Sequence, residues 1–127
     1  MRYLFDTHAM LWYFEDSPKL SESVVSIIED PAIQKCVSAA SLWEFSIKYS
    51  MNKLKFEGGL TALWEMVLGN GFPVIPIGEP HLNGLIRLPF IHRDPFDRLL
   101  VATAKAENLC ILTADENIHK YDVQSVW

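Results

Sequence analysis

Residues 92–100 of this 127-residue chain read His-Arg-Asp-Pro-Phe-Asp-Arg-Leu-Leu, which is the sharpest local pattern in the sequence. Asp94 is a good helix N-cap, and Pro95 suits the first helical position because an amide hydrogen there would have no partner within the helix. The pattern predicts a helix that runs to about Asn108. A short apolar strand, Leu109 to Leu112, follows directly. A helix that leads straight into an apolar strand is typical of an α/β domain.

The same alternation of strands and helices extends outward over the rest of the chain. Apolar runs predict strands at Tyr3–Phe5 and near Cys36–Val37, while the prolines within Phe72–Ile77 indicate an edge strand. Helices are predicted near residues 9–14, 21–29, 41–52, 60–68 and 80–88, a short one starts after 113–115, and a last edge strand covers 123–126. We therefore expect one α/β domain over residues 1–127, with a mostly parallel central sheet of about five short strands flanked by helices.

The start of the helix at residues 41–52 is predicted from a four-residue pattern. Ser41 and Glu44 form an S-x-x-E sequence, which is typical of a capping box at a helix N-terminus. This places Glu44 in the first turn, shortly after the Cys36–Val37 strand.

Composition excludes several classes of protein. Half of the residues are hydrophobic and 21% are charged, which argues against disorder and favours one packed core. Cys36 and Cys110 each stand in a short apolar run, so we expect buried, reduced thiols. Asp6 interrupts any N-terminal signal core, and the longest uncharged stretch, Met66–Gly78, is too short to span a bilayer. A cytoplasmic protein with no membrane segment is expected.

Four acidic residues stand where a strand has just ended or a helix is beginning: Asp6, Glu44, Asp97 and Asp115. The carboxyl ends of parallel strands lie at one edge of a sheet, so these side chains can meet in one crevice. Each acid alone has an ordinary explanation as a helix cap or first-turn acid. Together, crowded carboxylates repel one another unless a cation lies between them, and all-oxygen ligands suit Mg²⁺ or Mn²⁺.

Five segments spread almost end to end carry a family resemblance. They are Tyr-Leu-Phe-Asp-Thr-His (3–8), Ser-Ala-Ala-Ser-Leu-Trp-Glu (38–44), Lys-Tyr-Ser-Met-Asn-Lys-Leu (48–54), His-Arg-Asp-Pro-Phe-Asp-Arg-Leu-Leu-Val-Ala (92–102) and Leu-Thr-Ala-Asp (112–115). In these segments the chain resembles PIN domains, specifically the toxin subunits of VapBC-type toxin–antitoxin pairs. The resemblance implies a Mg²⁺-dependent endoribonuclease whose four catalytic and metal-binding acids are Asp6, Glu44, Asp97 and Asp115. It also implies an antitoxin partner that covers the acidic pocket.

The expected mechanism is hydrolysis of an RNA phosphodiester bond by a metal-activated water. Asp6 and Asp97 are the first choice as direct metal ligands, and Glu44 and Asp115 complete the site directly or through water. Thr7 and Thr113, next to these acids in the sequence, are expected as supporting residues.

Basic residues near the acids are candidate RNA contacts, and each has a simpler alternative. Arg93 and Arg98 can clamp phosphate, but Asp94 stands four residues before Arg98, which is the spacing of an ion pair on a helix surface. Lys48 belongs to a small basic stretch that either contacts RNA or forms a solvated helix face. His8 and His92 lie near the proposed site, where either a substrate contact or an ordinary surface role is open.

Aromatic residues are more numerous than a small core plainly needs, with seven Phe and four Trp: Trp12, Trp43, Trp64 and Trp127. Part of this surplus is expected to face a partner, which by resemblance is a second copy of the chain and an antitoxin. The alternative is simply an aromatic-rich core. A homodimer is therefore predicted.

Two other functions remain open from the sequence. A catalytically inactive interaction module of the same fold has the same motifs, whereas an aspartyl-phosphate enzyme using Asp6 is less favoured. A haloacid-dehalogenase-like start has a second Asp two residues after the first, and His8 stands there. The net charge of −5 argues against a polybasic coat protein, but removal of the four candidate ligands leaves 12 acids against 11 bases. RNA binding is thus expected to depend on the metal more than on a basic surface.

Overall fold

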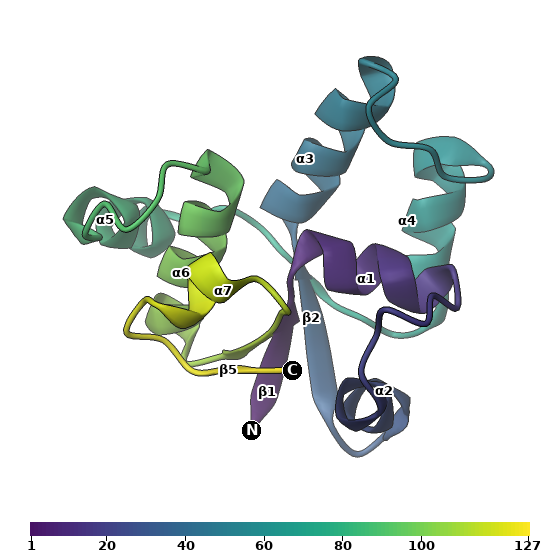
Figure 1. Ribbon diagram of the computed structural model, residues 1–127, viewed down its shortest axis with the longest axis horizontal. Helices are drawn as coiled ribbons and strands as arrows, with labels where there is room; N and C mark the ends of the chain where they lie inside the picture. Colours follow the sequence, from purple (N-terminus) through teal and green to yellow (C-terminus); the bar gives the residue numbers. More distant parts are fainter.

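Five strands form one sheet in the order β3-β2-β1-β4-β5, and every pairing in it is parallel. The computed structural model describes residues 1–127 (Figure 1). The strands are β1 (Arg2–Phe5), β2 (Gln34–Ser38), β3 (Val74–Ile75), β4 (Cys110–Leu112) and β5 (Ser125–Val126). The prediction of about five mostly parallel strands is confirmed. The chain lays down β1, β2 and β3 in one direction and then returns to place β4 and β5 on the other side of β1, so the strand order reverses between β1 and β4.

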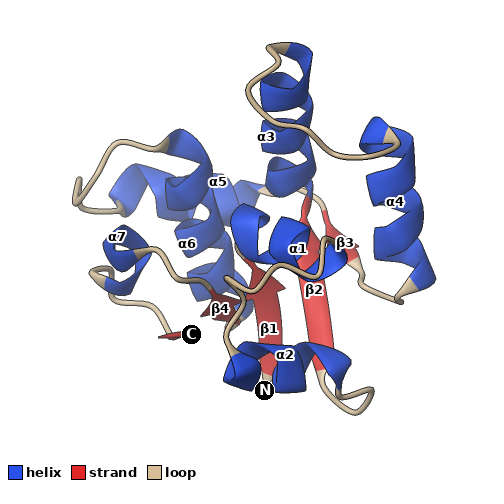
Figure 2. Ribbon diagram, turned by 45° about the vertical axis from the view of Figure 1, so that its right-hand side comes forward, coloured by secondary structure: helices blue, strands red, loops and turns tan.

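Seven helices surround the sheet (Figure 2). They are α1 (Thr7–Phe14), α2 (Glu22–Glu29), α3 (Ala39–Ser50), α4 (Gly59–Gly69), α5 (Glu79–Arg87), α6 (Pro95–Glu107) and α7 (Glu116–His119). The helix predicted from the His-Arg-Asp-Pro-Phe-Asp stretch is confirmed as α6, with Asp94 as its N-cap and Pro95 in its first turn. The Asp94 side chain accepts the backbone N–H of Asp97, which fixes the start of the helix.

The predicted start of α3 at Ser41 is wrong. Ser38 is the N-cap, because its hydroxyl accepts the N–H of Ala40 at 3.0 Å and the helix begins at Ala39. Ser41 and Glu44 therefore lie inside the helix and form no capping box. Because the helix begins at Ala39, Glu44 lies in its second turn. Its side chain is 3% exposed and does not cap the helix end.

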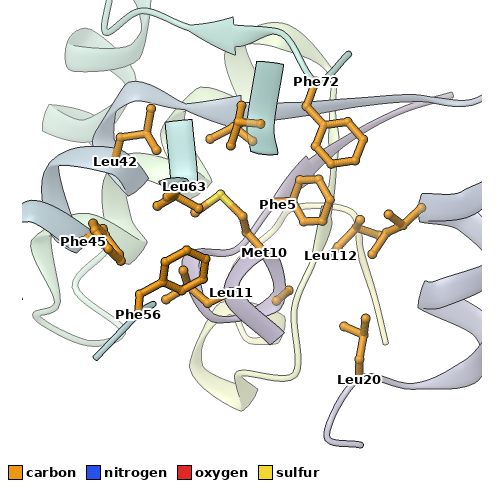
Figure 3. Close-up of a cluster of buried hydrophobic side chains, with 14 of the residues drawn as sticks. Phe5, Met10, Leu11, Leu20, Leu42, Phe45, Phe56, Leu63, Phe72 and Leu112 are labelled. Carbon is orange, nitrogen blue, oxygen red and sulfur yellow. The ribbon is translucent and has the colours of Figure 1, made fainter. Parts of the chain in front are cut away.

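Alternate residues of the central strand face two separate hydrophobic cores, as the pleat of a strand requires. Phe5 belongs to the larger cluster, which packs the sheet against α1, α2, α3 and α4, and its ring lies 5.2 Å from that of Phe72 (Figure 3). Leu4 belongs to the cluster on the other face, with side chains of α6 and α7 such as Leu100 and Ile118. α5 covers the outside of α6, where Gly84 faces Ala102.

The edge strands are short for local reasons. Pro73 and Pro76 flank β3 and leave only two residues to pair, which confirms this segment as an edge strand. β5 is shorter than the predicted 123–126, because the N–H of Val123 bonds the carbonyl of Tyr121 at 2.8 Å in a turn. Both cysteines are buried free thiols, and no helix has the length and apolar character needed to cross a membrane.

Candidate active site

The candidate site lies outside the carboxyl ends of β1 and β4, where the strand order reverses. Ligand sites of open parallel sheets form at this crevice, because the neighbouring crossovers leave in opposite directions. Asp6 directly follows β1, and its N–H still bonds the carbonyl of Leu112 at the end of β4. The starts of α1 and α3 lie together beyond the ends of β1 and β2 (Figure 1).

Asp6 is buried and firmly held. One carboxylate oxygen accepts the Thr113 hydroxyl at 2.7 Å, and the other accepts the N–H of His8 at 3.4 Å, so that Asp6 also caps α1. Burial raises the pKa of Asp6 and the charge of Glu44 adds to it, while the Thr113 hydrogen bond and His8 act in the opposite direction. Thr113 in turn accepts the N–H of Asp115 at 3.0 Å, and so it connects two of the four acids.

Glu44 points from the second turn of α3 toward the same crevice. Its Oε2 accepts from the Lys48 ammonium at 2.6 Å, one turn further along the helix. Its Oε1 is buried and has no hydrogen-bond partner. Burial favours the neutral amine of Lys48, but the hydrogen bond and charge of Glu44 outweigh this and raise the Lys48 pKa. A buried carboxylate oxygen without a hydrogen-bond partner lowers the stability of the fold. Glu44 Oε1 is therefore an acceptor that is expected to have a partner when the site is occupied.

Asp97 is, with Asp6, one of the two acids in the crevice whose pKa is raised. Burial raises its pKa to about 8, and the negative charges of Asp94, Asp6, Asp115 and Glu44 all act in the same direction. The structure thus brings the four predicted acids close enough for the charges of the other three to raise the pKa of Asp97. A carboxyl with its pKa raised in this way keeps a proton over part of the pH range in which a free Asp is ionised, unless a cation balances the charge of the crevice.

The supporting threonines occupy different places. Thr113 lies in the site between Asp6 and Asp115, whereas Thr7 donates its hydroxyl to Ser41 at 2.9 Å and joins α1 to α3. Both threonines are buried. The hydrogen bond from Thr7 to Ser41 therefore holds together α1, which Asp6 caps, and α3, which contains Glu44.

The burial of Arg98 argues against an RNA contact, and the alternative considered for it, an ion pair with Asp94, does not form. Its guanidinium is buried, donates to the carbonyl of Pro89 at 2.8 Å and of Leu88 at 3.4 Å, and lies 4.1 Å from the Phe90 ring centroid. The pattern Asp94-x-x-x-Arg98 has helix-surface spacing, but the loop before α6 folds back over the arginine. Arg93 is exposed, and Lys48 keeps a third of its side chain exposed while paired with Glu44.

Two residues near the acids carried little or no signal in the sequence. The ring of His92 contacts Asp97 Oδ2 through Nε2 at 3.2 Å and the Tyr121 hydroxyl through Nδ1 at 2.8 Å. Tyr121 is 29 positions from His92 and stands in no recognisable motif, so only the fold shows that it belongs to the site.

The aromatic surplus is partly accounted for by the core. Trp12 and Trp127 are half-buried and pack edge to face with ring centroids 5.7 Å apart, while Trp43 and Trp64 are 56% and 43% exposed. Trp43 lies against Phe96 of α6, so this pair joins the two helices that carry Glu44 and Asp97. A partner surface for the exposed aromatics stays a prediction.

The oxygen atoms in the crevice are of the type that hard divalent cations prefer as ligands. Asp6, Glu44, Asp97 and Asp115 supply carboxylate oxygens, one of which, Glu44 Oε1, is buried and unpartnered. No group of three or more Asp, Glu, His or Cys side chains is arranged so that it could hold a metal ion without movement of the side chains. The fold and the site together define a parallel α/β domain with a carboxylate-lined crevice at the reversal of strand order.

The chain belongs to the PIN domain family, which matches residues 3–124. No curated protein matches the sequence significantly. Solved structures of similar fold include VapBC2 from Rickettsia felis bound to a DNA fragment from its promoter, with 15% identity and a TM-score of 0.75, covering 99% of this chain and 98% of that one. VapBC-1 from nontypeable Haemophilus influenzae has 17% identity and a TM-score of 0.71, covering 99% and 97%. FitAcB from Neisseria gonorrhoeae has 22% identity and a TM-score of 0.66, covering 98% and 96%.

Proposed function

We propose that this protein is a Mg²⁺-dependent endoribonuclease, with Mn²⁺ as a substitute, and that it acts in the cytoplasm as the toxin of a toxin–antitoxin pair. The observation that carries the proposal is the unpartnered buried Oε1 of Glu44, within a crevice where burial and then the neighbouring acids raise the pKa of Asp97 to about 8. Such a site is unfavourable for the empty protein and favourable for one that binds a divalent cation. Membership of the PIN domain family supports the same conclusion.

Each acid has a distinct part in the proposed reaction. Asp6, held by Thr113, and Asp97, held at the start of α6, would be the direct ligands of the cation. When bound, the cation supplies charge for the phosphate and lowers the pKa of a water so that hydroxide is accessible near neutral pH. Glu44 keeps Oε2 on Lys48, and its free Oε1 would complete the ligand set directly or through a water that it orients toward the phosphodiester. Asp115, fixed through its N–H on Thr113, completes the acceptor set.

The remaining residues of the crevice bind and position substrate rather than attack it. No serine or cysteine nucleophile is required, since the Ser41 hydroxyl is engaged by Thr7 and both thiols are buried. Arg93 is exposed next to Asp94 and is the proposed contact for an RNA phosphate, and the free part of Lys48 is a second one. His8 stands two residues after Asp6, where an aspartyl-phosphate enzyme of the haloacid-dehalogenase type has a second Asp, which disfavours Asp6 as a phosphate acceptor.

We also propose that the chain forms a homodimer and binds an antitoxin protein. Large apolar side chains are exposed on α5 and the loop after it, where Ile86 is 79% and Phe90 81% exposed, with Leu82 and Ile91 beside them. A surface of this kind is typical of a protein–protein contact. The complexes of similar fold carry paired toxin–antitoxin names, VapBC and FitAcB, which favours an antitoxin as one partner.

The direct test is RNA cleavage by the purified chain, free of any partner. We expect single-stranded RNA to be cut with Mg²⁺ or Mn²⁺, not with EDTA, and Asp97→Asn to abolish cleavage while the circular dichroism spectrum is retained. Asp16→Asn is the matched control, because Asp16 is exposed and its positive φ of 51° is tolerated by Asn. Cleavage that resists EDTA, or full activity of Asp97→Asn, would exclude the metal mechanism. A folded wild-type chain that binds a partner but cuts no RNA would identify an inactive interaction module instead.

A further inference from the structure

A chain of hydrogen bonds leads from buried Arg98 to the carboxylate of Asp97. Arg98 donates from Nη1 to the Tyr121 hydroxyl at 3.2 Å, Tyr121 contacts His92 Nδ1 at 2.8 Å, and His92 Nε2 contacts Asp97 Oδ2 at 3.2 Å. The four residues come from the loop before α6, from α6 itself and from the segment after α7. Three parts of the chain thus converge on one oxygen of a proposed metal ligand.

The available donors and acceptors determine which atom donates in each of these hydrogen bonds. Arg98 and the backbone N–H of His92 both donate to the Tyr121 oxygen, and these two bonds use its acceptor positions. The hydroxyl hydrogen of Tyr121 is then available only as a donor to His92 Nδ1. A neutral imidazole that accepts at Nδ1 carries its hydrogen on Nε2, so His92 donates to Asp97 Oδ2. The arrangement makes Asp97 Oδ2 an acceptor whether or not the carboxyl is ionised, and it leaves Oδ1 for a proton or for a cation.

The network of hydrogen bonds from Arg98 to Asp97 is also held rigidly. Tyr121 and Arg98 are 4% and 5% exposed, and the guanidinium is further fixed by the carbonyls of Leu88 and Pro89. The rings of His92 and Tyr121 meet edge to face with centroids 5.4 Å apart. A ligand held by a packed network keeps one rotamer, and less conformational entropy is lost when it binds.

We propose that His92 and Tyr121, anchored by Arg98, are positioning residues that orient the Asp97 carboxylate for divalent cation binding. The proposal rests on the proposed function, since it concerns the same site. Loss of such a partner in metalloproteins typically weakens metal affinity or activity by about 10- to 100-fold. We expect a loss of that size in Mn²⁺ affinity when either His92 or Tyr121 is replaced.

The test is a double-mutant cycle of Mn²⁺ affinity, measured by titration calorimetry on the full chain. Tyr121→Phe removes the hydroxyl that fixes the imidazole, and His92→Leu removes the donor to Asp97; both are expected to raise the Mn²⁺ dissociation constant about tenfold or more. His92→Gln keeps a side-chain N–H close to the position of Nε2, so it is expected to retain more affinity than His92→Leu. Tyr13→Phe removes a hydroxyl outside the network and is the matched control, expected to change nothing.

The combined variants separate positioning from a general structural effect. In the His92→Gln background the amide needs no tautomer set by Tyr121, so adding Tyr121→Phe should weaken Mn²⁺ binding far less than it does in the wild type. Equal losses in both backgrounds, or wild-type affinity in Tyr121→Phe, would overturn the proposal while leaving the nuclease proposal intact. A folded wild-type chain that neither binds Mn²⁺ nor cuts RNA would overturn both.

Discussion

Asp97→Asn should stabilise the metal-free protein at alkaline pH, although it removes a proposed metal ligand. The pKa of Asp97 is raised from 3.8 to about 8, first by burial and then by the surrounding carboxylates. Between these two values the folded chain holds a proton on Asp97 that the unfolded chain has lost. The contribution of Asp97 to the free energy of unfolding therefore falls as pH rises from about 4 to about 8, and it stays low above that.

The size of the effect follows from the shift. One pKa unit corresponds to about 1.4 kcal/mol, so the whole range sets an upper limit of roughly 6 kcal/mol. Solvent screening and relaxation reduce this, because the Asp97 side chain is 14% exposed. We expect Asp97→Asn to be about 1–3 kcal/mol more stable than wild type at pH 8.5, or roughly 5–10 °C in Tm for a domain of this size. The substituted amide can still accept from His92, so no other contact is lost.

Thermal unfolding followed by circular dichroism in EDTA, at several values between pH 4 and 9, measures this difference. The gain of the variant should be smallest near pH 4, grow toward pH 8 and then level off, while Asp16→Asn should show no such trend. With excess Mn²⁺ the order should reverse, because only the wild type gains from the cation. A variant that is less stable than wild type at pH 8.5 in EDTA, or a gain that does not vary with pH, would refute the reasoning from crowded carboxylates.

Three further results are expected. Saturation with Mg²⁺ or Mn²⁺ should stabilise the wild type at pH 8, by about 2.7 kcal/mol at a cation concentration 100 times the dissociation constant, and Glu44→Gln should lose most of this gain in the same melting experiment. Thr113→Val should lower the free energy of unfolding in urea by about 1–3 kcal/mol, since Asp6 and the N–H of Asp115 each lose a buried hydrogen-bond partner. An unchanged unfolding midpoint would contradict the assigned hydrogen bonds. Arg98→Met should lower the free energy of unfolding by about 2–4 kcal/mol. Arg93→Met, at an exposed position, should change it by less than about 0.5 kcal/mol and weaken RNA binding instead. Equal unfolding midpoints for the two variants would show that Arg98 is not structural.

Local signals were sufficient for most of the fold. The N-cap and proline at Asp94-Pro95 determined the start of α6, because capping depends on atoms a few residues apart. The prolines around Val74–Ile75 determined an edge strand in the same local way. The start of α3 failed because Ser38 and Ser41 are both capable caps, and only the course of β2 up to Ser38 decides between them.

The four acids could be expected at one edge of the sheet because strand–helix alternation and parallel pairing place every strand end there. The structure brings Asp6, Glu44, Asp97 and Asp115 within electrostatic reach of one another, in agreement with that expectation. Their roles as metal ligands remain a proposal that the experiments above test. The burial that gives Asp97 its high pKa was not readable from the sequence, since it depends on all the elements packed around it.

What the sequence determined by itself was the alternation of strands and helices, the parallel sheet and the acids at its carboxyl edge, all of which follow from periodicity and from short-range capping. What only the tertiary structure decided was the fate of individual side chains. The spacing of Arg98 from Asp94 suits a helix surface, but Arg98 is buried beneath the Leu88–Pro89 loop. Tyr121 stands in no motif, and only the fold connects it to Asp97 through His92. The physical reason is that helix spacing specifies neighbours within one element, whereas hydrogen bonds between segments 20 to 30 positions apart form only after those segments have packed.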